Sequence, residues 1–190
     1  MMLLSFLPSV AAGACIGMGC VMFLTAQSQY VGALLFSIGL LFIRLCKFDL
    51  YTGAIQKAAR REISFLRLAQ ILAGNAVGIL LVYALSLLMG RDVADKAAAV
   101  GASVSQLPLT SVLGKAIFCG ALMTVATYPD APLWVSSMCV VAFILSGFRH
   151  SVADIFCMPE LTHWLTAVVG NLIGGYGLAW FDYMKKKNAA

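Results

Sequence analysis

A group of polar residues interrupts an apolar stretch of the chain, in the segment SGFRHSVAD between Ser146 and Asp154. The preceding segment, LWVSSMCVVAFIL from Leu133, carries no charged residue. Ionisable residues inside membrane segments are costly, and by default they suggest a pathway for an ion or a proton. A histidine has an unperturbed pKa near 6.5, so His150 suits both hydrogen bonding to an anion and proton exchange with it. The interruption that holds Arg149, His150 and Asp154 is therefore a candidate functional site.

The other reactive side chains form no catalytic or metal-binding pattern. The chain has two histidines, and it contains no HExxH motif, nucleophile elbow, carboxylate pair or cysteine–histidine arrangement. The second histidine, His163, is expected to be a surface residue in a short loop. The six cysteines lie singly in apolar surroundings, without CxxC or paired spacing. The sequence thus predicts no enzyme, no catalytic residues, no metal site and no cofactor.

The composition indicates a multi-pass membrane protein. Of 190 residues, 62% are hydrophobic and 11% are charged, and the mean hydropathy is +0.93. A soluble domain would be about a quarter charged. Membrane helices of about 20 residues leave room for about six spans, which form a single domain over 1–190. The first residues lack a basic start, so we interpret them as a span and not as a cleaved signal peptide.

The chain is expected to be all-helical, with membrane spans separated by polar links. The expected spans are 3–25, 30–61 with an interruption at RLCKFDLYTG, 64–89, 109–127, 133–158 with the interruption at SGFRHSVAD, and 164–183. The segment 90–108 is expected to be a polar link. The net charge of +5 gathers near 57–67 and 185–187. Such clusters are typical of cytoplasmic loops, so they predict cytoplasmic termini and give no sign of nucleic-acid binding.

The two halves, about 1–90 and 105–185, share a plan. An interrupted span precedes GNAVG in the first half and GNLIGG in the second. Each half has an odd number of spans, which predicts an inverted 3+3 repeat with two broken helices. The half-helices should begin near Gly53 and Ser151, with free N–H groups directed at the middle of the protein. The glycines are expected to permit close helix packing, and Asn75 and Asn171 to hydrogen-bond across helices and secure the breaks.

The motifs DLYTG, GNAVG, SGFRHSVADIF and GNLIGG, in this order, resemble the formate/nitrite transporter family over nearly the whole chain. The resemblance implies an aquaporin-like fold and a homopentamer in a prokaryotic inner or plasma membrane. Each protomer would have its own pore in the lipid bilayer. The implied substrate is a small monovalent anion or its conjugate acid, of the formate, nitrite, hydrosulfide and acetate class.

The same resemblance implies roles for individual residues. His150 corresponds to the central pore histidine of the family, and Thr52 to a threonine that can hydrogen-bond it. Apolar constrictions fall on five matching positions: Leu40, Leu50 and Tyr51 on the cytoplasmic side, and Phe36 and Phe143 on the periplasmic side. Tyr51 replaces the usual phenylalanine, which we expect to make that constriction slightly more polar.

The chain departs from the family pattern at several polar positions. Arg149 stands where the family has glutamate, Asp154 where it has asparagine, and Gly120 where it has asparagine. The lysine that usually precedes the fourth span has no clear match, with Lys96 and Lys115 as candidates. These departures affect the identity of the substrate more than the fold.

Arg149 and Asp154 are candidates for structure or selectivity, together with Asp49 at the corresponding break. On a helix, residues five apart form a poor pair. We therefore expect Arg149 to reach backbone carbonyls, Asp49 or the vestibule, and an Asp49–Arg149 ion pair joining the two breaks is a hypothesis.

Two other functions agree with the same broad pattern. One is a neutral-solute channel of the aquaporin type, although the paired Asn-Pro-Ala signatures are absent from the sequence. The other is a structural membrane protein that keeps the fold without conducting. The residues leave open which anion passes, in which direction, and whether by a channel or by a proton-coupled carrier.

Overall fold

A computed structural model describes residues 2–189, and the side chains of 6–188. Within that range all regular structure is helical, with no strand. The elements are α1 (Met2–Thr25), α2 (Gln29–Cys46), α3 (Tyr51–Ala59), α4 (Phe65–Ser86), the 3-10 turn η1 (Leu87–Met89), α5 (Asp92–Ser105), α6 (Leu109–Ala126), α7 (Leu133–Leu145), α8 (Ser151–Cys157) and α9 (Leu161–Ala189).

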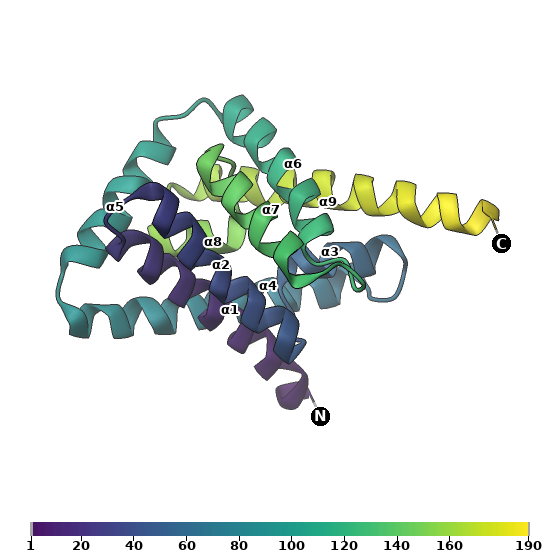
Figure 1. The fold of residues 1–190 in the computed structure, drawn as a ribbon, viewed down its shortest axis with the longest axis horizontal. Helices are drawn as coiled ribbons and strands as arrows, with labels where there is room; N and C mark the ends of the chain where they lie inside the picture. Colours follow the sequence, from purple (N-terminus) through teal and green to yellow (C-terminus); the bar gives the residue numbers. More distant parts are fainter. Residues whose placement is uncertain (1, 190) are drawn as a thin grey trace.

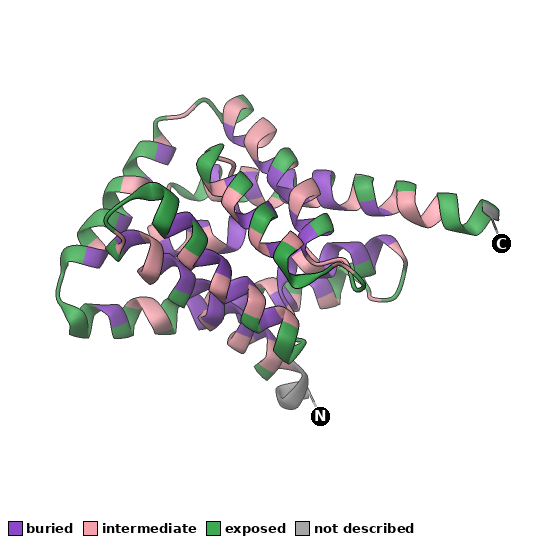
Figure 2. Cartoon of the chain, in the orientation of Figure 1, coloured by how far each residue is buried: buried purple, intermediate pink, exposed green. Residues whose placement is uncertain are grey.

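Among the described residues, five helices are long and apolar enough to cross a membrane, and they belong to α1, α2, α4, α6 and α9. The helix α7 is also apolar but has 13 residues. Large apolar side chains lie exposed on the outer faces, including Leu66, Leu88 and Phe181. Exposed apolar patches of this kind mark contact with a membrane or a partner. Buried residues lie instead on the faces that the helices turn toward one another (Figure 2).

The long helices pack in two similar groups. In the first, α1 contacts α2 and α4, and in the second, α6 contacts α7 and α9. The groups meet where α2 packs on α7, and the short helices α3 and α8 contact α4 and α9. In Figure 1, α5 lies at one end of the molecule, and α3 and the C-terminal part of α9 lie toward the other.

Both predicted interruptions are present in the structure. After α2, Lys47 adopts a left-handed conformation (φ 57°), and after α7, Gly147 does the same (φ 65°). The turns are closed alike, because the Phe48 N–H donates to Ile43 O at 3.0 Å and the Phe148 N–H to Phe143 O at 2.9 Å. The second half-helix begins at Ser151, as predicted, and the first begins at Tyr51, two residues before the expected Gly53. Glycine adopts the left-handed conformation of these turns without a steric penalty, as at Gly147, whereas Lys47 adopts it at some cost.

The predicted polar link at 90–108 was wrong, because most of it forms α5. Alanine is the strongest helix former, and Asp92 and Asp95 lie in the first turn, where negative charge opposes the helix dipole. Val93, Ala97 and Val104 are buried on one face. That stripe has the period of an amphipathic helix, and it was the signal in the sequence.

Close glycine contacts join α1 to α4 and α6 to α9, as predicted. A Cβ atom on Gly78 would lie 2.0 Å from the Val10 carbonyl oxygen, and one on Gly174 would lie 1.9 Å from that of Ile117. Likewise, a Cβ on Gly120 would lie 2.2 Å from Asn171 O. The asparagine that the family pattern has at position 120 would therefore not fit against this backbone.

Asn75 holds the first break through three hydrogen bonds. Its side-chain oxygen accepts from the Tyr51 N–H at 2.8 Å. Its side-chain nitrogen donates to Ser9 O at 2.7 Å and to Asp49 O at 2.9 Å. One buried side chain thus joins α1, α4 and the extended residues before α3.

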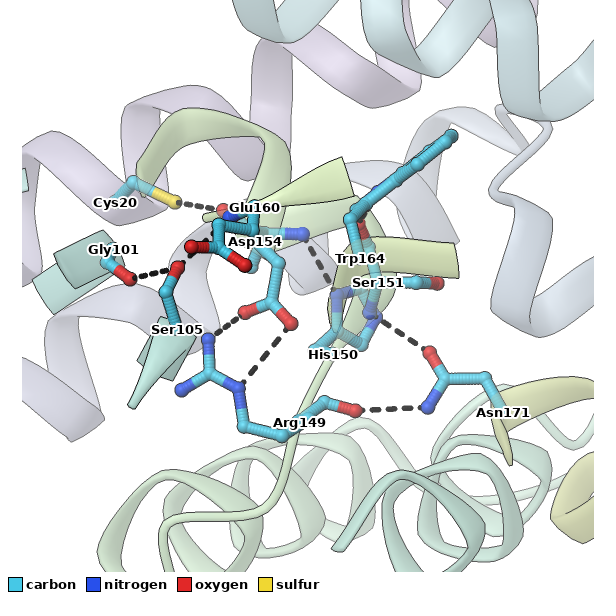
Figure 3. A network of polar contacts seen from close by, with 11 residues as sticks. Cys20, Gly101, Ser105, Arg149, His150, Ser151, Asp154, Glu160, Trp164 and Asn171 are labelled. Carbon is cyan, nitrogen blue, oxygen red and sulfur yellow. Dashed lines mark hydrogen bonds and ion pairs between the residues drawn. The ribbon is translucent and has the colours of Figure 1, made fainter. Parts of the chain in front are cut away.

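Asn171 does the same at the second break, as seen in part in Figure 3. Its oxygen accepts from the Ser151 N–H at 2.9 Å, and its nitrogen donates to Arg149 O at 2.8 Å and Ala116 O at 2.9 Å. Both asparagines thus hydrogen-bond across helices at the two breaks. The expectation of free N–H groups was wrong for Tyr51 and Ser151, the first residues of the two half-helices, because their N–H groups donate to the asparagine side chains.

We predict that Gly174→Ala destabilises the protein, because the added methyl group would collide with the α6 backbone. Gly177→Ala in the same helix is the matched control, since a Cβ there meets nothing within 4 Å. Overpacking of this kind costs about 1–3 kcal/mol. Thermal unfolding in detergent should show a lower midpoint for Gly174→Ala only, and equal midpoints would contradict the close contact.

We also predict that Asn171→Leu loosens the second break. The variant leaves the buried Ser151 N–H and the Arg149 carbonyl without their partner, at about 1–3 kcal/mol for each unsatisfied group. Hydrogen–deuterium exchange of peptides covering 146–154 should become faster. The control is Asn188→Leu, at an exposed position, and unchanged exchange at the break would refute the role of Asn171.

Candidate functional site

The centre of the candidate site is a contact between the two half-helices. Thr52, in the first turn of α3, and His150, just before α8, are 0% and 2% exposed. The Thr52 Oγ1 and His150 Nε2 atoms lie 3.0 Å apart. The contact that the family resemblance implied is therefore present, and it joins residues 98 apart in the sequence.

The other ring nitrogen defines the protonation state that fits this geometry. His150 is the N-cap of α8, and its Nδ1 atom accepts from the Ala153 N–H at 3.1 Å (Figure 3). A nitrogen that accepts a hydrogen bond carries no proton, so the geometry assigns a neutral ring with its proton on Nε2. Nε2 then donates to the Thr52 hydroxyl. The hydroxyl keeps its own proton for another acceptor.

Aromatic rings pack beside this contact. The ring of Phe143 stacks on His150 with centroids 5.5 Å apart, and Phe36 meets Phe143 edge to face at 5.9 Å. Both phenylalanines are 4% exposed. They border one side of the His150 ring with apolar surface.

Two cavities lie near the contact. A cavity of about 210 Å³ is lined by Phe36 of α2, Phe143 of α7 and Asp154 of α8, and by Arg149 and His150 from the extended segment before α8. A second cavity of about 460 Å³ is lined by residues around α3, including Asp49 and Leu50. We refer to them as the α8 cavity and the α3 cavity.

Of the remaining predicted constriction residues, Leu50 lines the α3 cavity, whereas Leu40 and Tyr51 line neither cavity. Leu40 is 0% exposed, and Leu50 and Tyr51 are each 3% exposed. The Tyr51 hydroxyl donates to Val168 O at 3.2 Å. This hydroxyl is therefore bonded to the backbone of α9.

The predicted partners of Arg149 were wrong. Arg149 forms a bidentate ion pair with Asp154, through Nε to Oδ2 at 3.3 Å and through Nη2 to Oδ1. The helical spacing argument fails because Arg149 lies in the extended segment before α8 and not in the helix. Asp49 pairs instead with Arg67 at 3.0 Å and with Lys57 at 3.5 Å.

The expected surface position of His163 was also wrong. His163 lies in the first turn of α9 and is 8% exposed. Its Nε2 atom lies 3.0 Å from Leu107 O, and its Nδ1 atom lies 3.6 Å from a carboxylate oxygen of Glu160. This histidine connects the loop before α6 to the start of α9.

Arg44 lines the α3 cavity, and the sequence analysis did not single it out. Its guanidinium donates to Ser136 Oγ at 2.8 Å and to Tyr128 O at 2.9 Å. An arginine in the last turn of an otherwise apolar helix was the available signal. No cluster of three or more metal-binding side chains occurs in the described part of the chain.

The chain is similar in sequence to a known family of transporters. The formate/nitrite transporter family model matches residues 2–163. The "Uncharacterized transporter YrhG" of Bacillus subtilis is 28% identical over 199 residues, covering 85% of this chain and 74% of the relative. The formate channel FocA of Haemophilus influenzae is 24% identical over 186 residues, covering 82% of this chain and 66% of the relative.

Solved structures have the same fold. An FNT family ion channel superposes with a TM-score of 0.79 at 22% identity, covering 99% of this chain and 90% of that one. A pentameric formate channel with formate bound has a TM-score of 0.76 at 19% identity, covering 98% and 97%. With the family model matching most of the chain and apolar helices of spanning length, the protein belongs to the formate/nitrite transporter family and is an integral membrane transporter, not an enzyme.

Proposed function

We propose that this protein moves small monovalent anions, or their conjugate acids, across the membrane through a pore centred on His150 and Thr52. The substrates are of the formate, nitrite, hydrosulfide and acetate class. The observation that carries the proposal is the buried Thr52–His150 contact. His150 lines the α8 cavity, and Gly53, next to Thr52, lines the α3 cavity.

Apolar side chains on both sides of the Thr52–His150 contact form the proposed constrictions. Phe36 and Phe143 line the α8 cavity beside His150 and form the proposed constriction there. Leu40, Leu50 and Tyr51 form the proposed constriction toward the α3 cavity, which Leu50 lines. Hydrophobic constrictions control passage by excluding water. An ion that enters them must lose hydration, so the centre has to supply hydrogen bonds in its place.

Thr52 and His150 supply those hydrogen bonds in the proposed mechanism. The His150 Nε2 proton and the Thr52 hydroxyl proton are two donors at one buried place. An anion that approaches Thr52 accepts a hydrogen bond from its hydroxyl group. The hydroxyl oxygen in turn accepts a hydrogen bond from the His150 Nε2–H group. A weak acid can also cross as its neutral form, which avoids the cost of a bare charge in the bilayer.

We further propose six spans arranged as an inverted repeat, in a single channel domain over 1–190 with halves of about 1–90 and 105–185. In this arrangement α2 with α3, and α7 with α8, each form one broken span. The matched asparagine hydrogen bonds support it. So do the matched contacts of α1 with α4 and of α6 with α9.

The proposed topology has both termini in the cytoplasm of a prokaryotic cell, at its inner or plasma membrane. Arg60 lies 3.9 Å from Asp182, and the Tyr128 hydroxyl donates to Asp182 at 3.0 Å. These contacts gather the basic loop near 60, the loop at 128–130 and the end of α9 on one side. A concentration of basic residues supports a cytoplasmic side.

We propose that the protein assembles as a homopentamer with one pore in each protomer. The support is the fold shared with a pentameric formate channel and the apolar outer faces of the helices.

The proposal is tested by flux into proteoliposomes with formate, nitrite, hydrosulfide and acetate at two pH values. We expect wild-type flux to rise at the lower pH, because more of each weak acid is neutral there. His150→Ala removes both the pore donor and the α8 cap. His150→Asn is the sharper variant, because asparagine can still cap a helix but has no imidazole to donate to Thr52.

We expect His150→Asn to fold like wild type and to lose about tenfold or more of the anion flux, the scale of one strong hydrogen bond. Full flux in this variant would mean that His150 only caps α8. Glycerol or urea flux without anion flux would favour a neutral-solute channel, and absence of all flux would favour a structural protein.

A further inference from the structure

The α8 cavity is lined by one fixed cation and one fixed anion, Arg149 and Asp154. Their side chains are 14% and 6% exposed, so the pair is nearly buried. Phe36 and Phe143 line the same cavity beside His150. An anion in this cavity would therefore meet the ion pair in the same space as His150 and the two phenylalanine rings.

Asp154 occupies only one edge of the guanidinium group. It accepts from Nε and from Nη2, which form the side edge. A guanidinium group has five N–H donors and a second, terminal edge made by Nη1 and Nη2. Among the described residues no hydrogen bond to Arg149 Nη1 is present, and Figure 3 shows this nitrogen without a dashed contact.

We propose that the terminal edge of Arg149 is a binding site for planar anions with two oxygens, such as formate, nitrite or another small carboxylate. The site lies in the α8 cavity, before the Phe36–Phe143 constriction. Asp154 is a positioning residue that holds the guanidinium group from the opposite edge. This inference rests on the proposed function and adds to it a first site of substrate selection.

The geometry of arginine gives this site its selectivity. Two parallel N–H donors match the two oxygens of a carboxylate, and such pairs are stronger and more directional than contacts with a point charge. Hydrosulfide has one acceptor atom and cannot form the paired contact. The site therefore favours formate and nitrite over hydrosulfide.

Asp154 also sets how tightly an anion is held. Its charge balances that of Arg149, so the empty cavity is close to neutral. Passage through a pore requires binding that is favourable enough for entry and weak enough for release. Without the carboxylate, the guanidinium would hold an anion more tightly and release it more slowly.

Lys96 is the nearest cation on the neighbouring helix α5, and it provides a matched control. Its Nζ atom donates to Leu24 O at 2.9 Å, and Leu24 lines the α8 cavity. Lys96 itself is not among the residues that line this cavity. A lysine near the rim can attract all anions, but it does not offer a planar pair of donors.

The test compares formate with hydrosulfide in proteoliposomes that contain the full chain. Arg149→Gln/Asp154→Asn removes the guanidinium group and keeps the cavity neutral. We expect the half-saturation concentration for formate to rise by about tenfold, the scale of a charge-assisted pair of hydrogen bonds, and that for hydrosulfide to change little. Arg149→Lys keeps the charge and the partner but loses the planar edge, so the same loss of preference is expected.

Asp154→Asn should have the opposite effect on formate binding. We expect a lower half-saturation concentration for formate and a lower maximal flux. Lys96→Gln should alter both anions by the same factor. Equal changes for formate and hydrosulfide in Arg149→Lys, or an unchanged preference for formate in the double variant, would overturn this inference. Flux through the wild-type protein in the same experiment would still support the proposed pore. Wild-type protein that carries neither anion would overturn both proposals.

Discussion

The structure depends on one constraint: backbone that breaks inside an apolar protein must still have hydrogen-bond partners. In a bilayer, each unsatisfied N–H or carbonyl group costs several kcal/mol. Asn75 and Asn171 meet this need, because each accepts from the first N–H of a half-helix and donates to a carbonyl on the extended side of the break. Without such a side chain, the backbone groups at each break would lose a buried hydrogen-bond partner, and the break would loosen.

The glycine contacts are a consequence of the same constraint. An asparagine side chain is short, so it reaches the break only if its own helix lies close to the neighbouring helix. Gly78 and Gly174 permit that approach, since neither backbone leaves space for a Cβ atom. The matched packing of α1 with α4 and of α6 with α9 thus determines where the breaks lie and, through them, where Thr52 and His150 meet.

The ion pair of Arg149 and Asp154 is an addition to this shared frame. Burying a single charge is costly, and a partner with good geometry offsets much of that cost. The family pattern has glutamate and asparagine at these two positions, and this chain has arginine and aspartate. The two replacements are compatible because they occur together, and they turn a pair of polar residues into a guanidinium group with one edge held and one edge open.

The sequence by itself determined the breaks, the asparagines beside them and the ionisable His150, because these follow from a local pattern of apolar length, glycine and polar interruption. Thr52 followed from the resemblance to the family. Only the tertiary structure decided the partners of the charged residues and the burial of His163. Arg149 lies outside a helix, so helical spacing could not predict its pairing with Asp154. Partner choice depends on distances in space, which the local sequence pattern does not contain.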